Sequence, residues 1–171
     1  MRMIDERPVE VEDRLQAGHW EGDLIMGAGN RSAIGTLVER ATRFLILLPF
    51  TEGVATTEGV RHAITAALAG LPAGLRRTLT WDQGKELALH PQITTATGTD
   101  VFFCDAHSPW QRGSNENMNG LLRDYFPKGT DLSVHTVEDV VRIAGEVNDR
   151  PRKTLGWQRP AELFAAASVA A

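Results

Sequence analysis

The sequence predicts a single α/β domain in which helices lie on both faces of a mixed five-stranded sheet. The 171 residues, 42% hydrophobic and 23% charged, match one ordinary globular domain in size and composition. Three strand-like runs joined by turn residues open the chain, and helical and strand periods alternate after them. Antiparallel strands followed by such an alternation are typical of a layered domain with a mixed sheet.

The three opening strands are predicted over residues 20–26, 33–40 and 43–50. Glycines and an asparagine mark the turn between the first two. The third strand contains Phe44–Leu48, which is apolar at every position, so we expect it to be covered on both sides of the sheet. Before these strands, residues 1–18 are charged and lack periodicity, and we interpret them as a linker or N-terminal arm.

The remaining elements follow from changes of period and from capping residues. The prediction is a helix over 56–71, a strand over 75–82, a helical segment over 85–90, a Thr-rich connection after Pro91, a strand over 101–104, a helix that begins at the N-cap Ser114 and reaches Tyr125, a helix over 137–149 capped by Thr136, and an irregular basic segment that ends in a helical turn at 161–164. We therefore expect one core domain over 19–165 and a C-terminal tail over 166–171.

Charge and cysteine content narrow the function classes. Residues 1–23 hold three basic and seven acidic residues, while the rest of the chain balances at fifteen against fifteen, so the net charge of −4 lies at the N-terminus. The total charge therefore does not exclude a nucleic-acid partner. The single Cys104 excludes an intrachain disulfide and a cysteine-based zinc site. With no apolar stretch of membrane-spanning length and no apolar signal core, we expect a cytoplasmic protein that does not enter a membrane.

A polar stripe on the helix over 114–125 is the first candidate site. Glu116, Asn119 and Arg123 fall on one face at helical spacing. A glutamate in the first turn is also explained by the helix dipole alone. However, Asn115 and Asn117 lie in the same turns and are poor helix formers. A helix segment with such low intrinsic stability is typical of a functional site.

Two aspartates join Glu116 as candidates. Asp23 lies inside a strand, where a charge is costly unless it has a partner or faces solvent, and Asp82 ends another strand, where it can simply cap a following helix. Together the three carboxylates can converge at one end of the mixed sheet. Carboxylate oxygens are the ligands that Mg²⁺ and Mn²⁺ prefer, and two such ions promote attack on a phosphodiester.

Four segments carry a family resemblance: GHWEGDLI (18–25), TWDQGKEL (80–87), SPWQRGSNENMNGLLRDYFPKG (108–129) and NDRPRKTLGWQRPAELF (148–164). They resemble the catalytic core of bacterial insertion-sequence transposases of the insertion-sequence-thirty type, within the DDE transposase and retroviral-integrase superfamily. The 33 residues between Asp82 and Glu116 match the spacing of that group. The resemblance implies a ribonuclease-H-like fold.

The resemblance also implies roles for individual residues. Asp23, Asp82 and Glu116 would be the catalytic triad and would hold two Mg²⁺ or Mn²⁺ ions, with Asp23 between them. Arg123, seven residues after Glu116, stands where such enzymes place a DNA-binding cation, although an exposed helix cation explains it equally.

Weaker candidates for DNA contacts lie near these segments. Trp110 and Arg112 can stack on or clamp DNA, although Trp110 can also anchor its loop on the core. His107 in the same loop can touch DNA or a leaving group, but we interpret it as a surface or structural histidine. Asn119 shares the stripe of Glu116. The basic residues Arg152 and Lys153 are favoured as phosphate contacts over a solvated helix end.

The predicted function is metal-dependent DNA strand cleavage and strand transfer by a transposase or integrase core. The predicted partners are the element ends and target DNA, with a homodimer or higher oligomer and no small-molecule cofactor. Transposases of this type carry an N-terminal helix-turn-helix region, and only 22 residues precede Asp23, so we expect sequence-specific end recognition to be missing. The alternative is a non-catalytic DNA-binding or dimerisation remnant that regulates a full-length transposase.

Overall fold

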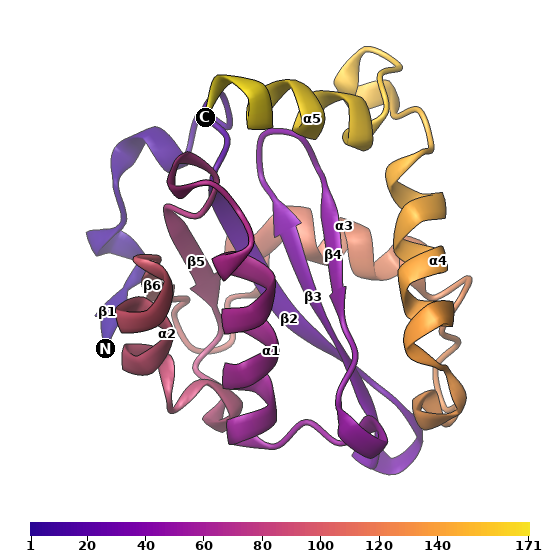
Figure 1. The fold of residues 1–171 in the computed structure, drawn as a ribbon. Coiled ribbons are helices and arrows are strands. Elements are labelled where there is room, and N and C mark those ends of the chain that lie inside the picture. The colour runs from indigo at the N-terminus through magenta and orange to yellow at the C-terminus, as the bar shows by residue number, and fades with distance from the viewer.

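The computed structural model describes residues 1–171, except for the side chain of Pro109. A six-stranded mixed sheet forms the centre, with helices packed on both faces (Figure 1). In chain order the elements are β1 (Arg2–Met3), β2 (His19–Met26), β3 (Ala33–Glu39), β4 (Leu45–Leu48), α1 (Thr57–Ala69), β5 (Thr78–Trp81), α2 (His90–Thr97), β6 (Asp100–Phe103), α3 (Gly113–Leu122), α4 (Val137–Asn148) and α5 (Pro160–Ala170).

The sheet order is β1-β6-β5-β2-β3-β4. Strands β2, β3 and β4 pair antiparallel as predicted, and β5 pairs in parallel with both β2 and β6. The predicted count of five strands was wrong by one, because Arg2 and Met3 of the N-terminal arm pair in parallel with Phe102 and Phe103 at the edge. Two residues are too few to give a periodic signal, so the sequence pattern could not indicate this strand.

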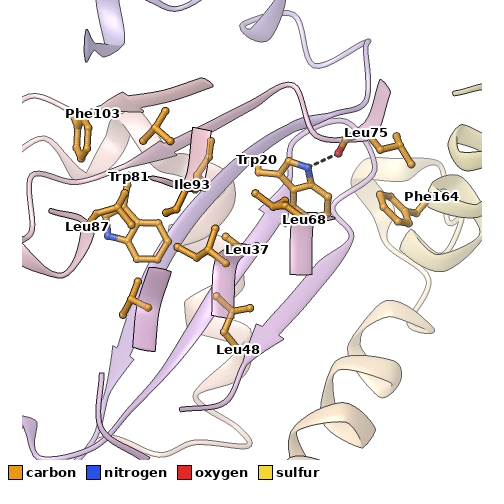
Figure 2. Close-up of a cluster of buried hydrophobic side chains, with 14 residues drawn as sticks. Trp20, Leu37, Leu48, Leu68, Leu75, Trp81, Leu87, Ile93, Phe103 and Phe164 are labelled. Atoms are coloured by element: carbon orange, nitrogen blue, oxygen red, sulfur yellow. Dashed lines mark hydrogen bonds between the residues drawn. The ribbon is translucent and has the colours of Figure 1, made fainter. Parts of the chain in front are cut away.

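Two hydrophobic cores lie on opposite faces of the sheet. The first packs α1, α2 and α5 against the sheet around Trp20, Trp81 and Phe164, and Trp20 Nε1 donates a hydrogen bond of 2.8 Å to the Leu75 carbonyl (Figure 2). The second packs α3 and α4 against Ile25 and Val38. Since side chains alternate along β2, Glu21 and Asp23 face α3 as Ile25 does. Both acidic residues of β2 therefore lie under the helix that carries Glu116.

A glycine in β2 sets how closely β5 approaches. A Cβ added at Gly22 would lie 2.1 Å from the Trp81 ring, so the ring fills the space that a side chain would need. This close packing fixes β2 beside β5 immediately next to Asp23.

The predictions for α2 and α5 differ from the structure. The Thr-rich connection after Pro91 is α2, because Pro91 fits the first turn, the Thr95 and Thr97 hydroxyls donate to carbonyls four residues earlier, and Gly98 takes a left-handed conformation at the C-cap. The predicted turn at 161–164 extends into α5 up to Ala170.

The helix of Glu116 also has other ends than predicted. Ser114 is not the N-cap, because α3 starts at Gly113 and the Ser114 hydroxyl bonds arginine side chains instead of the helix backbone. The helix stops at Leu122, before Tyr125. By contrast, α4 has the predicted cap, with Thr136 and Asp139 in a reciprocal capping box.

Candidate active site

Asp23 and Asp82 come from neighbouring parallel strands. Glu21 of β2 lies opposite Thr80 of β5, and continuing this register by two residues brings Asp82 beside Asp23. Asp82 Oδ1 accepts a 3.0 Å hydrogen bond from the Gly84 amide, which turns the chain away from the sheet. The two aspartates thus border a common cleft of about 440 Å³ with Leu24 and Lys85.

Arg112 bridges these two carboxylates. Its Nη1 lies 3.3 Å from Asp23 Oδ2 and its Nη2 lies 3.7 Å from Asp82 Oδ2. Nη1 also donates to the Gly22 carbonyl at 2.8 Å. Although burial acts to lower the pKa of Arg112, the two aspartates raise it overall. Burial raises the pKa of Asp23, and Arg112 opposes that rise. A single buried cation therefore balances two carboxylates.

Asn119 fixes the orientation of Asp23 from α3. Its side-chain amide donates a 3.1 Å hydrogen bond to Asp23 Oδ2, while its own Oδ1 is buried with no hydrogen-bond partner among the described residues. Glu116, one turn earlier, is exposed and shares a small cavity of about 50 Å³ with Asp23 and Arg112. Glu116 therefore borders Asp23 and Arg112, while Asp82 lies outside this small cavity.

The donor chemistry of this site fits a divalent cation. Two carboxylates and a buried, unpartnered amide oxygen are hard ligands of the type that Mg²⁺ and Mn²⁺ take. Within the described side chains, no three residues among Asp, Glu, His and Cys come close enough to hold one ion. The structure thus brings Asp23 and Asp82 together and leaves Glu116 at the rim.

Sequence reasoning missed Glu21, which is fully buried. Its carboxylate accepts a 2.9 Å hydrogen bond from the backbone amide of Asn115 in the first turn of α3, and it pairs with the Arg40 guanidinium. Asn115 in turn donates through its side chain to the Glu21 carbonyl at 3.1 Å. Glu21 therefore anchors the start of the helix that carries Glu116. The available signal was a second acidic residue two positions before Asp23, on the same face of the strand.

The predicted DNA-contact residues occupy different environments. Arg123 points back, with Nη1 3.4 Å from the Met26 carbonyl and 3.2 Å from the Phe126 carbonyl. Trp110 is 70% exposed, so it does not anchor its loop on the core. Lys153 is exposed and Arg152 is half-buried. His107 is exposed beside Asp82 and Cys104 in a cleft of about 330 Å³. Burial raises the pKa of the Cys104 thiol.

Several curated transposases are similar to this chain. A transposase for insertion sequence element IS1086 from Cupriavidus metallidurans is 54% identical over 165 residues, which are 96% of this chain and 48% of the relative. Transposase InsI for insertion sequence element IS30C from Escherichia coli is 47% identical over 161 residues, 94% of this chain and 41% of the relative. The chain thus spans less than half the length of these relatives. No family model matches it.

Solved integrase structures share the fold. A crystal structure of the catalytic core domain of BIV integrase superposes with a TM-score of 0.64 at 18% identity and covers 88% of this chain and 95% of the integrase chain. A chain of the simian T-cell lymphotropic virus intasome, in complex with a PP2A regulatory subunit, superposes with a TM-score of 0.58 at 19% identity, over 78% of this chain and 49% of that one. The predicted ribonuclease-H-like fold is confirmed.

Among the described residues, none of the helices has both the length and the apolar composition that crossing a bilayer requires.

Proposed function

We propose that the chain is the integrase-like catalytic core of an IS30-type insertion-sequence transposase and that it cleaves and joins DNA strands with the help of divalent cations, which its 54% and 47% identity to the IS1086 and IS30C transposases supports. In the proposed reaction, water first attacks a phosphodiester and releases a DNA 3′-hydroxyl. That hydroxyl then attacks a phosphodiester of the target DNA, with no covalent protein intermediate.

The observation that carries this proposal is the convergence of Asp23 and Asp82 under α3. We propose that these two carboxylates, the unpartnered Asn119 Oδ1 and Glu116 hold the cations. When bound, Mg²⁺ or Mn²⁺ ions supply Lewis-acid activation of the attacking oxygen and stabilise charge on the leaving oxygen. Asp23 lines one cavity with Asp82 and another with Glu116, which supports a site for two ions.

The other side chains of the site position these ligands. Asn119 orients Asp23 through its 3.1 Å hydrogen bond. The buried Glu21 binds the N-terminus of α3 and thereby sets the position of Glu116 relative to the sheet. Arg112 neutralises the aspartates and, being a guanidinium, can turn to a DNA phosphate once cations replace it. The exposed Trp110 lies beside it and offers a flat surface to a DNA base.

A cleavage assay tests this function. Labelled duplexes that carry element ends are incubated with the protein in Mn²⁺, Mg²⁺ or EDTA, and Asp82→Asn is compared with the wild type. We expect strand cleavage that needs the cation and falls at least about a thousandfold in the variant, because one ligand is lost. Arg61→Gln on the opposite face of the sheet is the matched control and should cleave like the wild type.

Two outcomes would contradict the proposal. Cleavage that persists in EDTA or in Asp82→Asn would remove the metal-dependent mechanism. A wild type that binds DNA and divalent cations but never cuts would favour the non-catalytic remnant.

A further inference from the structure

Two arginines contact the N-terminus of α3 directly, Arg14 of the N-terminal arm and Arg43 before β4. Two more lie near them: Arg40 after β3, which pairs with Glu21, and Arg7 of the arm, which pairs with Glu12. Three carboxylates lie near them: Glu12, the buried Glu21, and Asp5, which lines the same cavity as Arg7, Arg14 and Arg40. Arg14 and Arg43 form no ion pair among the described residues, so neither guanidinium has a carboxylate in direct contact.

These two side chains, the arginine pair, meet at one atom. Arg14 Nη1 and Arg43 Nη1 both donate to the Ser114 hydroxyl oxygen, in the first turn of α3. A neutral hydroxyl cannot compensate two guanidinium charges, and the positive end of the helix dipole adds to their field. Like charges gathered in this way are destabilising unless an anion joins them.

The surrounding charges strengthen this imbalance. Burial lowers the pKa of Arg43, the positive charges of Arg14 and Arg152 lower it further, and the carboxylate of Glu21 opposes this decrease. Arg152 Nη1 is itself buried with no hydrogen-bond partner in the described part of the structure. Both members of the arginine pair remain half-buried, so an anion can reach them from solvent.

Buried contacts join the first turn of α3, strand β2 and the N-terminal arm next to the arginine pair. Glu21 holds the Asn115 amide at 2.9 Å and pairs with Arg40, and Arg40 also donates to the Val11 carbonyl at 3.1 Å. The N-terminal arm is thereby fastened to the same helix turn. The backbone that carries Arg14 is therefore held against the domain by these contacts.

We propose that Arg14 and Arg43, with Arg152 beside them, form a binding site for a backbone phosphate of the DNA strand that enters the active site. Ser114 precedes Glu116 by two residues, which is about 3 Å along the helix axis. Two residues also turn the helix by about 200°, so a phosphate held at Ser114 lies across the first turn of α3 from Glu116 and holds the strand at this end of the helix. This inference rests on the proposed function, because DNA supplies the anion.

The test measures DNA affinity without catalysis. A fluorescent duplex of arbitrary sequence is titrated with the wild type, the double variant Arg14→Gln/Arg43→Gln and the control Arg61→Gln, in Ca²⁺, over a series of salt concentrations. Losing one or two phosphate contacts should reduce the slope of log affinity against log salt by about 1 to 2 and weaken binding roughly equally for every sequence. The control should retain the wild-type slope.

A charge-preserving variant separates binding from folding. Arg14→Lys/Arg43→Lys should keep most of the wild-type salt slope, while thermal melts establish that all variants are folded. If the arginine pair only held α3 in place, the glutamine variant would melt at a lower temperature than the wild type. We expect no such decrease, because the substitution removes repulsion between like charges.

The outcomes separate this site from the proposed function. A glutamine variant with the affinity and salt slope of the wild type would overturn the phosphate site, even if the wild type cleaves DNA. A wild type with no measurable DNA affinity would overturn it as well. Weaker DNA binding by the glutamine variant supports the phosphate site even where Mn²⁺-dependent cleavage fails, in which case only the proposed function falls.

Discussion

At the residue scale, the candidate active site holds two negative carboxylates, Asp23 and Asp82, against one positive guanidinium, Arg112. Asp23 and Asp82 lie on adjacent strands, where two carboxylates close together repel each other. Arg112 offsets that repulsion with distances of 3.3 and 3.7 Å. The guanidinium thus occupies the position that cations would take between the same oxygens, and cation binding requires it to move.

Replacing Arg112 should therefore strengthen cation binding by the DNA-free protein. In Arg112→Met the aspartates lose their competing cation, and we expect Mn²⁺ to bind about tenfold more tightly, or ~1.4 kcal/mol. Isothermal titration measures this, with Arg112→Lys as the control that keeps the charge. Equal or weaker Mn²⁺ affinity in the methionine variant would show that Arg112 does not compete with the ion.

His19 predicts a pH dependence of stability. Burial, helped by the nearby Arg77, lowers the pKa of His19 from 6.5 to about 4. Between these values the unfolded chain binds the proton and the folded chain does not, so stability is complete above about pH 6.5 and declines as the pH falls towards 4. The full effect is about 3 kcal/mol.

Urea unfolding at several pH values checks this prediction. In His19→Gln the decline between pH 6.5 and 4 should be smaller than in the wild type by about that amount. His62→Gln, at an exposed position of α1, is the matched control. Wild-type and His19→Gln curves that run parallel would refute the assignment.

At the element scale, α3 is held at its N-terminus by a buried ion pair rather than by a cap of its own. Arg112 stands at the N-cap without a side-chain capping bond, and the Glu21 carboxylate takes the Asn115 amide in its place. Sequence reasoning chose Ser114 because serine is a favoured cap. It failed because the competing partners, Arg14 and Arg43, lie about 100 and 71 positions away and are visible only in the fold.

Glu21→Gln should destabilise the protein by about 3 kcal/mol, because the buried Arg40 loses its close counter-charge and keeps only the exposed Glu12, at 3.9 Å. Equilibrium unfolding measures the loss. In the double variant Glu21→Gln/Arg40→Met part of the stability should return. Additive losses in the double variant would mean that the two side chains are not coupled.

Alanine substitutions at Gly22 and Gly120 should change stability in opposite directions, because only Gly22 lies against another side chain. Gly22→Ala places a Cβ 2.1 Å from the Trp81 ring and should cost about 1–3 kcal/mol or more. Gly120→Ala meets nothing within 4 Å in the interior of α3 and should stabilise by about 0.5–1 kcal/mol. Thermal melts check both signs. A tolerated Gly22→Ala would contradict the close approach of β2 and β5.

At the scale of the whole molecule, long periodic segments were predictable and short or non-local features were not. The patterns of β2, α1 and α4 are local and strong, and each predicted element exists within a few residues. Strand β1, by contrast, has two residues and depends on the edge of β6. The bridge of Arg112 and the anchor of Glu21 depend on contacts between distant segments, which single-sequence periodicity does not encode. The carboxylates were nevertheless indicated, because a charge within a strand is unusual, as at Asp23, and because Glu116 stands among asparagines that weaken its helix.

Anomalous diffraction from crystals soaked in Mn²⁺ tests the proposed metal site most directly. We predict an anomalous peak between the carboxylates of Asp23 and Asp82, with Arg112 turned away from both and Glu116 rotated towards the ion. Crystals at saturating Mn²⁺ in which Asp23 and Asp82 are ordered, Arg112 still bridges them and no anomalous peak lies between them would contradict the metal-dependent active site.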